Sequence, residues 1–193
     1  MSMTNSRSVF FSVQTLLAVL LVVIFAATAV AQERGEFTEE GVREFTQQQF
    51  EAMYRKAMAN ASERLEDGEA IKAFAVVADR KSEIRVVRID KVETFPPNVA
   101  LEVMRRSLRV LVKNGGIGAT CLVYVAPNPD KDSNAEFVVV AEMEHIFGPT
   151  LAQVTPYSLD NGKIKVGKPV AVESKPSIFV FKKQEPRTTR QDS

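Results

Sequence analysis

Between Ala119 and Val172 one strand-like segment follows another, with only loops between them. The segments span residues 119–126, 136–147, 151–159 and 163–172, and the last two flank Asp160-Asn161-Gly162. Asn-Gly between apolar runs is the strongest short-range signal for a β-hairpin. Because strands here follow strands rather than alternating with helices, the pattern predicts an antiparallel sheet.

Two helices and a further hairpin precede these strands. Apolar residues recur at helical spacing over residues 38–67, a stretch that ends at Gly68. A second helix is expected to open at Pro96-Pro97, to carry its apolar stripe on Leu101, Met104, Leu108 and Leu111, and to end at Gly115-Gly116. Between them, residues 72–79 and 84–90 are rich in β-branched side chains and flank a polar turn, as a hairpin does. A last strand is predicted at residues 177–181.

The resulting order, α-β-β-α-β-β-β-β, predicts an α+β domain. We expect an antiparallel sheet of five to six strands with two helices packed on one face of it. Profilin-like and roadblock-like folds share this kind of order, which is an analogy of element order only and lends no function. The domain is expected to span residues 32–182, followed by a disordered polar tail at residues 183–193.

The first 31 residues have the pattern of an export signal. Arg7 is the only charged residue before Glu33, residues 9–25 are mostly apolar, and Ala29-Val30-Ala31 supplies an A-x-A cleavage site. We therefore expect a signal peptide over residues 1–31 and a mature protein in the periplasm or the extracellular space. The alternative is an uncleaved inner-membrane anchor formed by residues 9–31, since the apolar run approaches the length that spans a bilayer.

Charge and cysteine content exclude some classes of function. The chain has 25 Lys and Arg residues against 24 Asp and Glu residues, so removal of Arg7 with the signal peptide leaves 24 of each. A chain without net charge has no long-range attraction for a polyanion, so we expect no nucleic-acid partner. Cys121 is the only cysteine, which excludes an intrachain disulfide.

The segment EMEHIFG, residues 142–148, holds the only histidine of the chain, with two glutamates beside it. On a regular strand Glu142 and Glu144 share one face while His145 lies on the other. The three polar groups then do not converge on a metal or an acid–base site, and zinc sites use several nitrogen or sulfur ligands rather than one imidazole. We expect two solvated glutamates and a histidine at the sheet rim.

A nucleophile pair of Cys121 and His145 is also unfavourable. A hairpin centred near Lys131 separates them by about four residues, or ~13 Å at ~3.3 Å per residue. A catalytic nucleophile and its base must lie within hydrogen-bond distance of each other. Cys121 lies among Ala119 and Val123, so we expect a buried and unreactive thiol.

The loop Asp130-Lys131-Asp132-Ser133-Asn134 opens like a calcium-binding loop. The later positions depart from that pattern: Ala135 stands where the sharp turn needs glycine, and Ala141 where a bidentate acid belongs. Asp, Asn and Ser are ordinary turn residues, so a polar hairpin loop is the favoured interpretation.

A cluster of basic residues lies on the second helix, at Arg105, Arg106, Arg109 and Lys113. It suggests an anion or an acidic partner. Cations near a helix C-terminus are stabilising in any case, and Glu102 can pair with Arg106 at i,i+4. We therefore expect a solvated face.

The end of the chain resembles a set of small uncharacterised bacterial α+β proteins, in the run EHIFG…TPYSLDNGKIKVGKP…SIF. The resemblance covers about residues 115–179, and the matching positions are Glu144, His145, Gly148, Pro156, Tyr157, Gly162 and Gly167. It implies one domain that ends in a β-meander, and it implies no function.

These observations favour a non-enzymatic binding or interaction domain of the cell envelope or the extracellular space. Its partner would be a protein or a small molecule, with membrane contact only through an uncleaved N-terminal segment. No catalytic residue, cofactor or metal ligand is assigned. The alternative is a hydrolase-like enzyme or a weak calcium-binding module that uses Glu142, Glu144, His145 and the Asp130–Asn134 loop. An enzyme needs polar groups that meet in a pocket, whereas a binding module needs an exposed apolar patch or sheet edge.

Overall fold

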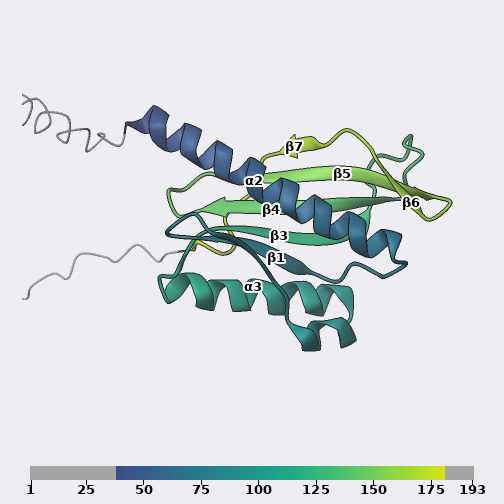
Figure 1. The fold of residues 1–193 in the computed structure, drawn as a ribbon, viewed down its shortest axis with the longest axis horizontal. Coiled ribbons are helices and arrows are strands. Elements are labelled where there is room, and N and C mark those ends of the chain that lie inside the picture. The colour runs from purple at the N-terminus through teal and green to yellow at the C-terminus, as the bar shows by residue number, and fades with distance from the viewer. Residues whose placement is uncertain (1–37, 181–193) are drawn as a thin grey trace, which may run out of the picture. The chain divides into compact units, whose positions relative to one another are not determined.

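The structure is a computed structural model that describes residues 38–180, so the predicted signal peptide and polar tail lie outside the described residues. The helices and strands all belong to one compact unit, Glu39–Ser193. They are α2 (Glu39–Glu66), β1 (Phe74–Asp79), β2 (Ile84–Val87), the 3-10 helix η1 (Asp90–Thr94), α3 (Pro97–Lys113), β3 (Ile117–Pro127), β4 (Phe137–His145), β5 (Thr150–Asp160), β6 (Lys163–Val166) and β7 (Val170–Val172). Figure 1 shows α2 and α3 flanking a single sheet. Within residues 38–180, no helix has the length and apolar character of a membrane span.

The sheet is antiparallel and has the order β2-β1-β3-β4-β5-β6, with β7 also paired to β5. The long hairpin β3–β4 forms its centre, from the pair Pro127–Phe137 to the pair Ala119–His145. The predicted Asn-Gly hairpin joins β5 to β6, and Asn161 and Gly162 have the positive φ angles, 50° and 76°, that such a turn needs. The predicted α+β class and element order are confirmed.

Helix α2 begins directly after Thr38 and ends before Gly68, as its spacing predicts. Gly68 has a φ of 76°, and the N–H of Glu69 donates to the carbonyl of Arg64 at 2.9 Å, which satisfies a carbonyl of the last turn. Only one side of α2 is buried, through residues such as Phe50, Met53 and Ala57. That side packs against the centre of the sheet.

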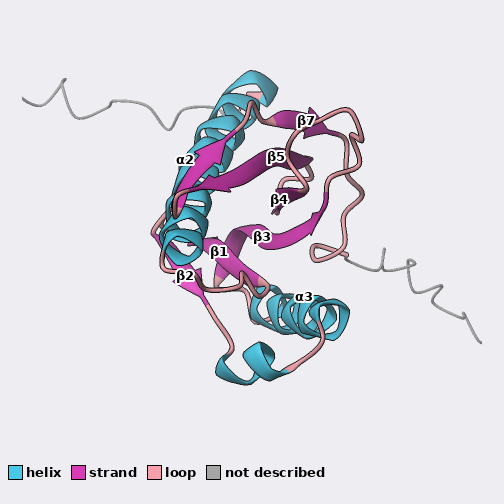
Figure 2. Cartoon of the chain, turned by 90° about the vertical axis from the view of Figure 1, so that its right-hand side faces the viewer, coloured by secondary structure: helices cyan, strands magenta, loops and turns pink. Residues whose placement is uncertain are grey.

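The helices cover opposite faces of the curled sheet, so the prediction that both lie on one face is wrong (Figure 2). Phe74 and Val76 of β1 pack under α2, whereas Ala75 and Val77 pack under α3 with Met104 and Leu108. The first five residues of β1 are all buried. A continuous apolar run is typical of a strand covered on both faces, and the run FAVVA carries that signal in the sequence.

The predicted last strand at residues 177–181 is also wrong for the part that the structure describes. Residues 177–179 form bends, and none of residues 177–180 pairs with a strand. The predicted strand at residues 163–172 divides into β6 and β7 around Gly167. The N–H of Gly167 donates to the carbonyl of Pro156 at 2.7 Å, and a Cβ atom at Gly167 would lie 3.3 Å from Pro156. This close approach of two backbones interrupts the strand.

Candidate functional site

The segment EMEHIFG ends β4, and its polar side chains point to opposite faces of the sheet. Glu142 hydrogen-bonds Arg105 of α3, and Glu144 contacts the segment that runs beside α3. His145 instead packs its ring against Phe45 and Phe50 of α2. The prediction that the two glutamates and the histidine do not converge is confirmed.

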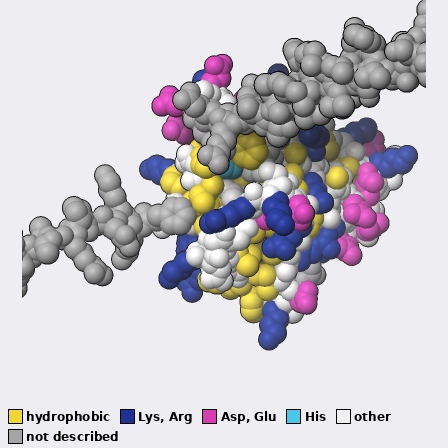
Figure 3. Space-filling view, turned by 60° about the vertical axis from the view of Figure 1, so that its left-hand side comes forward, with side chains coloured by type: hydrophobic (Ala, Val, Ile, Leu, Met, Phe, Trp, Pro, Cys, Tyr) yellow, Lys and Arg dark blue, Asp and Glu magenta, His cyan; other side chains and the backbone are white. Residues whose placement is uncertain are grey.

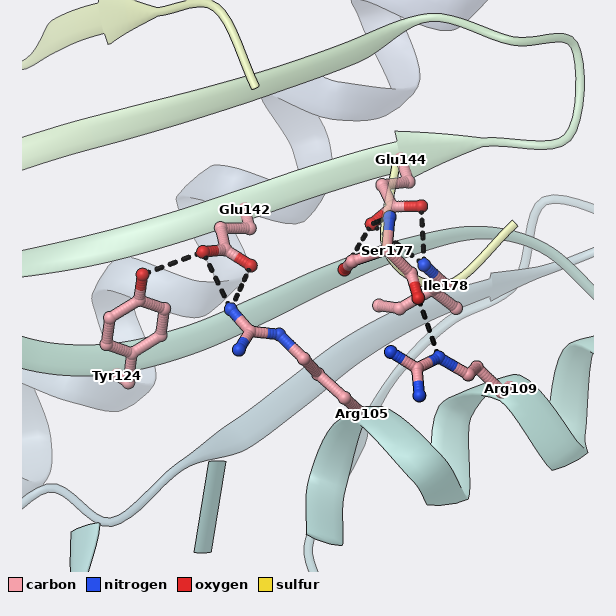
Figure 4. A network of polar contacts seen from close by, with 7 residues as sticks. All are labelled: Arg105, Arg109, Tyr124, Glu142, Glu144, Ser177 and Ile178. Atoms are coloured by element: carbon pink, nitrogen blue, oxygen red, sulfur yellow. Dashed lines mark hydrogen bonds and ion pairs between the residues drawn. The ribbon is translucent and has the colours of Figure 1, made fainter. Parts of the chain in front are cut away.

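Glu142 takes part in a half-buried ion pair rather than facing solvent (Figure 4). One guanidinium nitrogen of Arg105 lies 2.8 Å and 3.0 Å from its two oxygens, and the Tyr124 hydroxyl donates to it at 2.7 Å. Burial alone would lower the pKa of Arg105, but the hydrogen bond to Glu142 holds it above its usual value. Burial, together with the same carboxylate, raises the pKa of Tyr124. Neither Arg105 nor Tyr124 is therefore suited to proton transfer near neutral pH.

Glu144 binds Ser177, Ile178 and Phe179 within residues 174–180, which we call the strap. Its carboxylate is 2% exposed and accepts hydrogen bonds from the N–H groups of Ser177, Ile178 and Phe179 and from the Ser177 hydroxyl, at 2.8–3.1 Å. Three successive N–H groups directed at one carboxylate form an anion-binding concavity. Since both glutamates have internal partners, the expectation of a solvated pair is wrong.

The basic residues of α3 also differ in their surroundings, because some face solvent and others bind internal partners. Arg106 is exposed and pairs with Glu102 at 3.1 Å, as predicted. Arg105 turns toward the sheet, and Nε of Arg109 donates to the carbonyl of Ser177 at 2.7 Å. Arg105 lies four residues after Leu101, on the apolar stripe of the helix, and this spacing is the signal that could have distinguished it from Arg106. No sequence signal indicates that Glu144 binds the strap, because its partners are backbone groups.

His145 is buried beneath an aromatic cluster. Its side chain is 3% exposed, its ring centroid lies 4.8 Å from that of Phe147, and Nδ1 accepts the N–H of Phe147 at 3.1 Å. Burial lowers the pKa of His145. The neutral imidazole of His145 accepts a backbone N–H through Nδ1 and thus forms part of the turn at Gly148. This nitrogen is therefore not free to bind a metal.

Cys121 is fully buried, and burial raises the pKa of its thiol to about 12. The expectation that this thiol is buried is confirmed, and its low reactivity stays a prediction; the predicted hairpin register is wrong by two residues. Cys121 pairs with Met143, and His145 pairs with Ala119. The cysteine and the histidine are therefore two residues apart along the sheet, about 7 Å rather than ~13 Å, which is still beyond hydrogen-bond reach.

The Asp130–Asn134 loop directs side-chain oxygens toward its own backbone. Oδ1 of Asp130 accepts the N–H of Asp132, Oδ1 of Asn128 accepts the N–H of Asp130, and the hydroxyl of Ser133 accepts the N–H of Ala135. The loop precedes β4, so five residues of strand, roughly 17 Å, separate it from Glu142. Among residues 38–180, no three His, Cys, Asp or Glu side chains are grouped to hold a metal ion.

An open groove lies on the other face, between α2 and the start of β5; we call it the α2 groove. It has a volume of about 380 Å³, an apolar lining that includes Phe50, Met143 and Leu151, and polar residues such as Arg43 and Gln153. Phe45 and Phe147, 41% and 50% exposed, both pack against the His145 ring, which also packs against Phe50 of the groove lining. We call these two rings the aromatic patch. Figure 3 shows hydrophobic side chains gathered around the cyan histidine on this side of the molecule.

The polar residues of EMEHIFG line neither this groove nor the smaller hollow near the start of α3. That hollow has a volume of about 200 Å³ and is lined by Leu101, Tyr124 and neighbouring apolar residues. Glu142, Glu144 and His145 are absent from both linings.

Comparisons with known protein families, with curated proteins and with solved structures give no match to this chain. The resemblance of the chain end to small bacterial α+β proteins therefore stays a prediction.

Proposed function

We propose that this domain is a non-enzymatic binding domain of the periplasm or the extracellular space, and that it holds a protein partner in the α2 groove and on the aromatic patch. The observation that carries the proposal is an open, mostly apolar groove beside two half-exposed phenylalanine rings. Aromatic residues in such positions are typical of the buried centre of an interface.

The size of the groove supports this proposal. Its volume of about 380 Å³ falls in the range of ligand-binding clefts, roughly 300–1,000 Å³. The patch extends the apolar surface beyond the groove, which favours a polypeptide over a small molecule. Covering the exposed half of each phenylalanine would contribute about 1 kcal/mol per ring, since full burial contributes ~1.5–3 kcal/mol.

The alternative, an enzyme or a weak calcium-binding module, requires Glu142, Glu144, His145 and the Asp130–Asn134 loop to meet. The two glutamates face α3, the histidine faces α2, and the loop precedes the strand that carries all three. Glu142 and Glu144 are each bound by internal donors, so this pair is not free for acid–base work. The geometry therefore favours binding over catalysis.

Size measurement of the native protein tests the proposal. Extracts of the cells that make this protein would be separated by gel filtration, with wild type compared with Phe147→Ser and with Val110→Ser, a control on α3 that is 58% exposed. Wild type and the control should elute as a complex, and Phe147→Ser as the free chain. Elution of all three at the position of the free chain would contradict the proposal.

The mass of the mature protein tests the export part separately. We expect a chain that begins at Gln32 in the periplasmic or secreted fraction. A protein that retains residues 1–31 in the membrane fraction would favour the anchored alternative, and a cytoplasmic protein would contradict both.

A further inference from the structure

The strap is held as a bound peptide is held, by side chains that recognise its backbone. It has no strand pairing, although it lies beside β4 and α3. Glu144 binds the N–H groups of three successive residues, Arg109 binds the carbonyl of Ser177, and the Thr150 hydroxyl donates to the carbonyl of Ser174 at 2.6 Å. Side chains of the domain thus form hydrogen bonds with both N–H donors and carbonyl acceptors of the strap backbone.

A hydrophobic pocket adds specificity to this backbone recognition. Ile178 is 3% exposed and belongs to the buried cluster that contains Met104, Leu108 and Leu122. Phe179 packs against the same cluster, and Val180, one residue further on, is 62% exposed. The site therefore selects a bent segment with Ser, an aliphatic residue and an aromatic residue in succession. We call it the strap site.

Only a short link ties the strap to the sheet. Glu173 alone separates β7 from the strap, and Glu173 is exposed, as are Lys175 and Pro176 at the start of the strap. Pro176 disfavours a helical conformation at Lys175, so the start of the strap tends to be extended. Opening this link would let the strap leave its own domain without unpairing β7.

We propose that the strap site also binds the strap of a second copy of this chain, so that two copies exchange their C-terminal segments. The second copy is the partner that the structure favours, because its residues 174–180 offer the same contacts to Glu144, Arg109 and Thr150. This interaction uses the α3 face of the sheet and is independent of the α2 groove.

Concentration decides whether exchange is observed. A short link gives the chain's own strap an effective concentration in the millimolar range, so the intact chain is expected to be monomeric at micromolar concentration. Exchange becomes visible when one copy has a defective strap and the other a defective strap site, because neither then has a competing interaction within its own chain.

Mixing of two full-length variants provides the test. Ile178→Asp places a carboxylate in the apolar pocket and disables the strap, whereas Glu144→Gln weakens the strap site. At about 0.1 mM, below the millimolar effective concentration of a short link, each variant alone should be monomeric by native mass spectrometry and the mixture should contain the heterodimer. Glu142→Gln mixed with Ile178→Asp is the matched control, and it should give no heterodimer because its own strap remains bound.

Failure of a variant to fold does not remove the test. If Ile178→Asp is unfolded alone, its far-UV circular dichroism signal should return when Glu144→Gln is added, since the missing strap is then supplied by the second chain. Absence of both heterodimer and recovered structure in the mixture would overturn the proposal. A heterodimer that also forms with Glu142→Gln would overturn it too, because association would then not depend on a released strap.

Discussion

Replacement of Glu144 by glutamine tests how the strap is held. The carboxylate of Glu144 accepts four donors: the N–H groups of Ser177, Ile178 and Phe179 and the hydroxyl of Ser177. Glutamine is nearly isosteric, so the change leaves no cavity. Its amide nitrogen, however, is a donor, and it must replace one of the two acceptor oxygens.

The free-energy cost of Glu144→Gln follows from the partners of the two carboxylate oxygens. Oε1 serves the two Ser177 donors at 2.8 Å, and Oε2 serves the N–H groups of Ile178 and Phe179 at 2.9 Å and 3.0 Å. Keeping the amide oxygen toward Ser177 leaves the Phe179 N–H facing a donor, whereas the Ile178 N–H keeps its 3.1 Å hydrogen bond to the Oε1 position. An unsatisfied buried donor costs about 1–3 kcal/mol. Glutamine is neutral, so the variant avoids the cost of burying a charge, and this offsets part of the lost hydrogen bonding. We expect Glu144→Gln to lower the free energy of unfolding by about 1–3 kcal/mol.

Denaturant unfolding measures this change, and amide hydrogen exchange locates it. In Glu144→Gln the amides of Ser177, Ile178 and Phe179 should exchange fast, while the central strands β3 and β4 keep their protection. Glu142→Gln is the control, because Glu142 bonds Arg105 and Tyr124 rather than the strap. An unfolding free energy within about 0.5 kcal/mol of wild type, with the strap amides still protected, would refute this reasoning.

Three further predictions concern single side chains. The pKa of His145 is lowered from 6.5 by burial, so the unfolded chain binds the proton more tightly and stability should fall as pH drops below about 6.5. His145→Ala should reduce this pH dependence in denaturant unfolding at pH 8 to 5, at a cost of about 0.5–3 kcal/mol at neutral pH; an unchanged slope would contradict it. Cys121 should react slowly with a thiol reagent in the native protein and rapidly after unfolding, because burial raises its pKa to about 12; rapid native labelling would show an accessible thiolate. Tyr124→Phe removes the 2.7 Å hydrogen bond to Glu142 and should lower the denaturation midpoint by the equivalent of about 1–2 kcal/mol; an unchanged midpoint would show that the bond contributes nothing.

Much of the fold could be predicted because it depends on local signals. Gly68 and the pair Asn161-Gly162 mark a helix end and a hairpin turn through backbone conformations that other residues avoid. The prediction that both helices cover one face is wrong because it rests on the usual layering of α+β domains, whereas the unbroken run FAVVA of β1 is buried on both faces.

The candidate site was only partly predictable. Strand alternation correctly separates His145 from Glu142 and Glu144, because the period of two follows from backbone geometry alone. The internal partners of the two glutamates could not be predicted, since Glu144 binds backbone groups of the strap, 33 to 35 residues further along the chain. The α2 groove was missed for the same reason: it forms where residues near the start of α2 meet Met143 and the start of β5.

Photo-crosslinking at the aromatic patch tests most directly whether this domain binds a partner there. A photoreactive residue would replace Phe147 in one full-length chain and Val110 in another, since both positions are at least half exposed, at 50% and 58%. Irradiation of cells that make each protein, followed by mass spectrometry, should give a defined protein adduct at position 147 and none at position 110. Equal adducts at both positions, or none at position 147 in the correctly exported protein, would contradict the account.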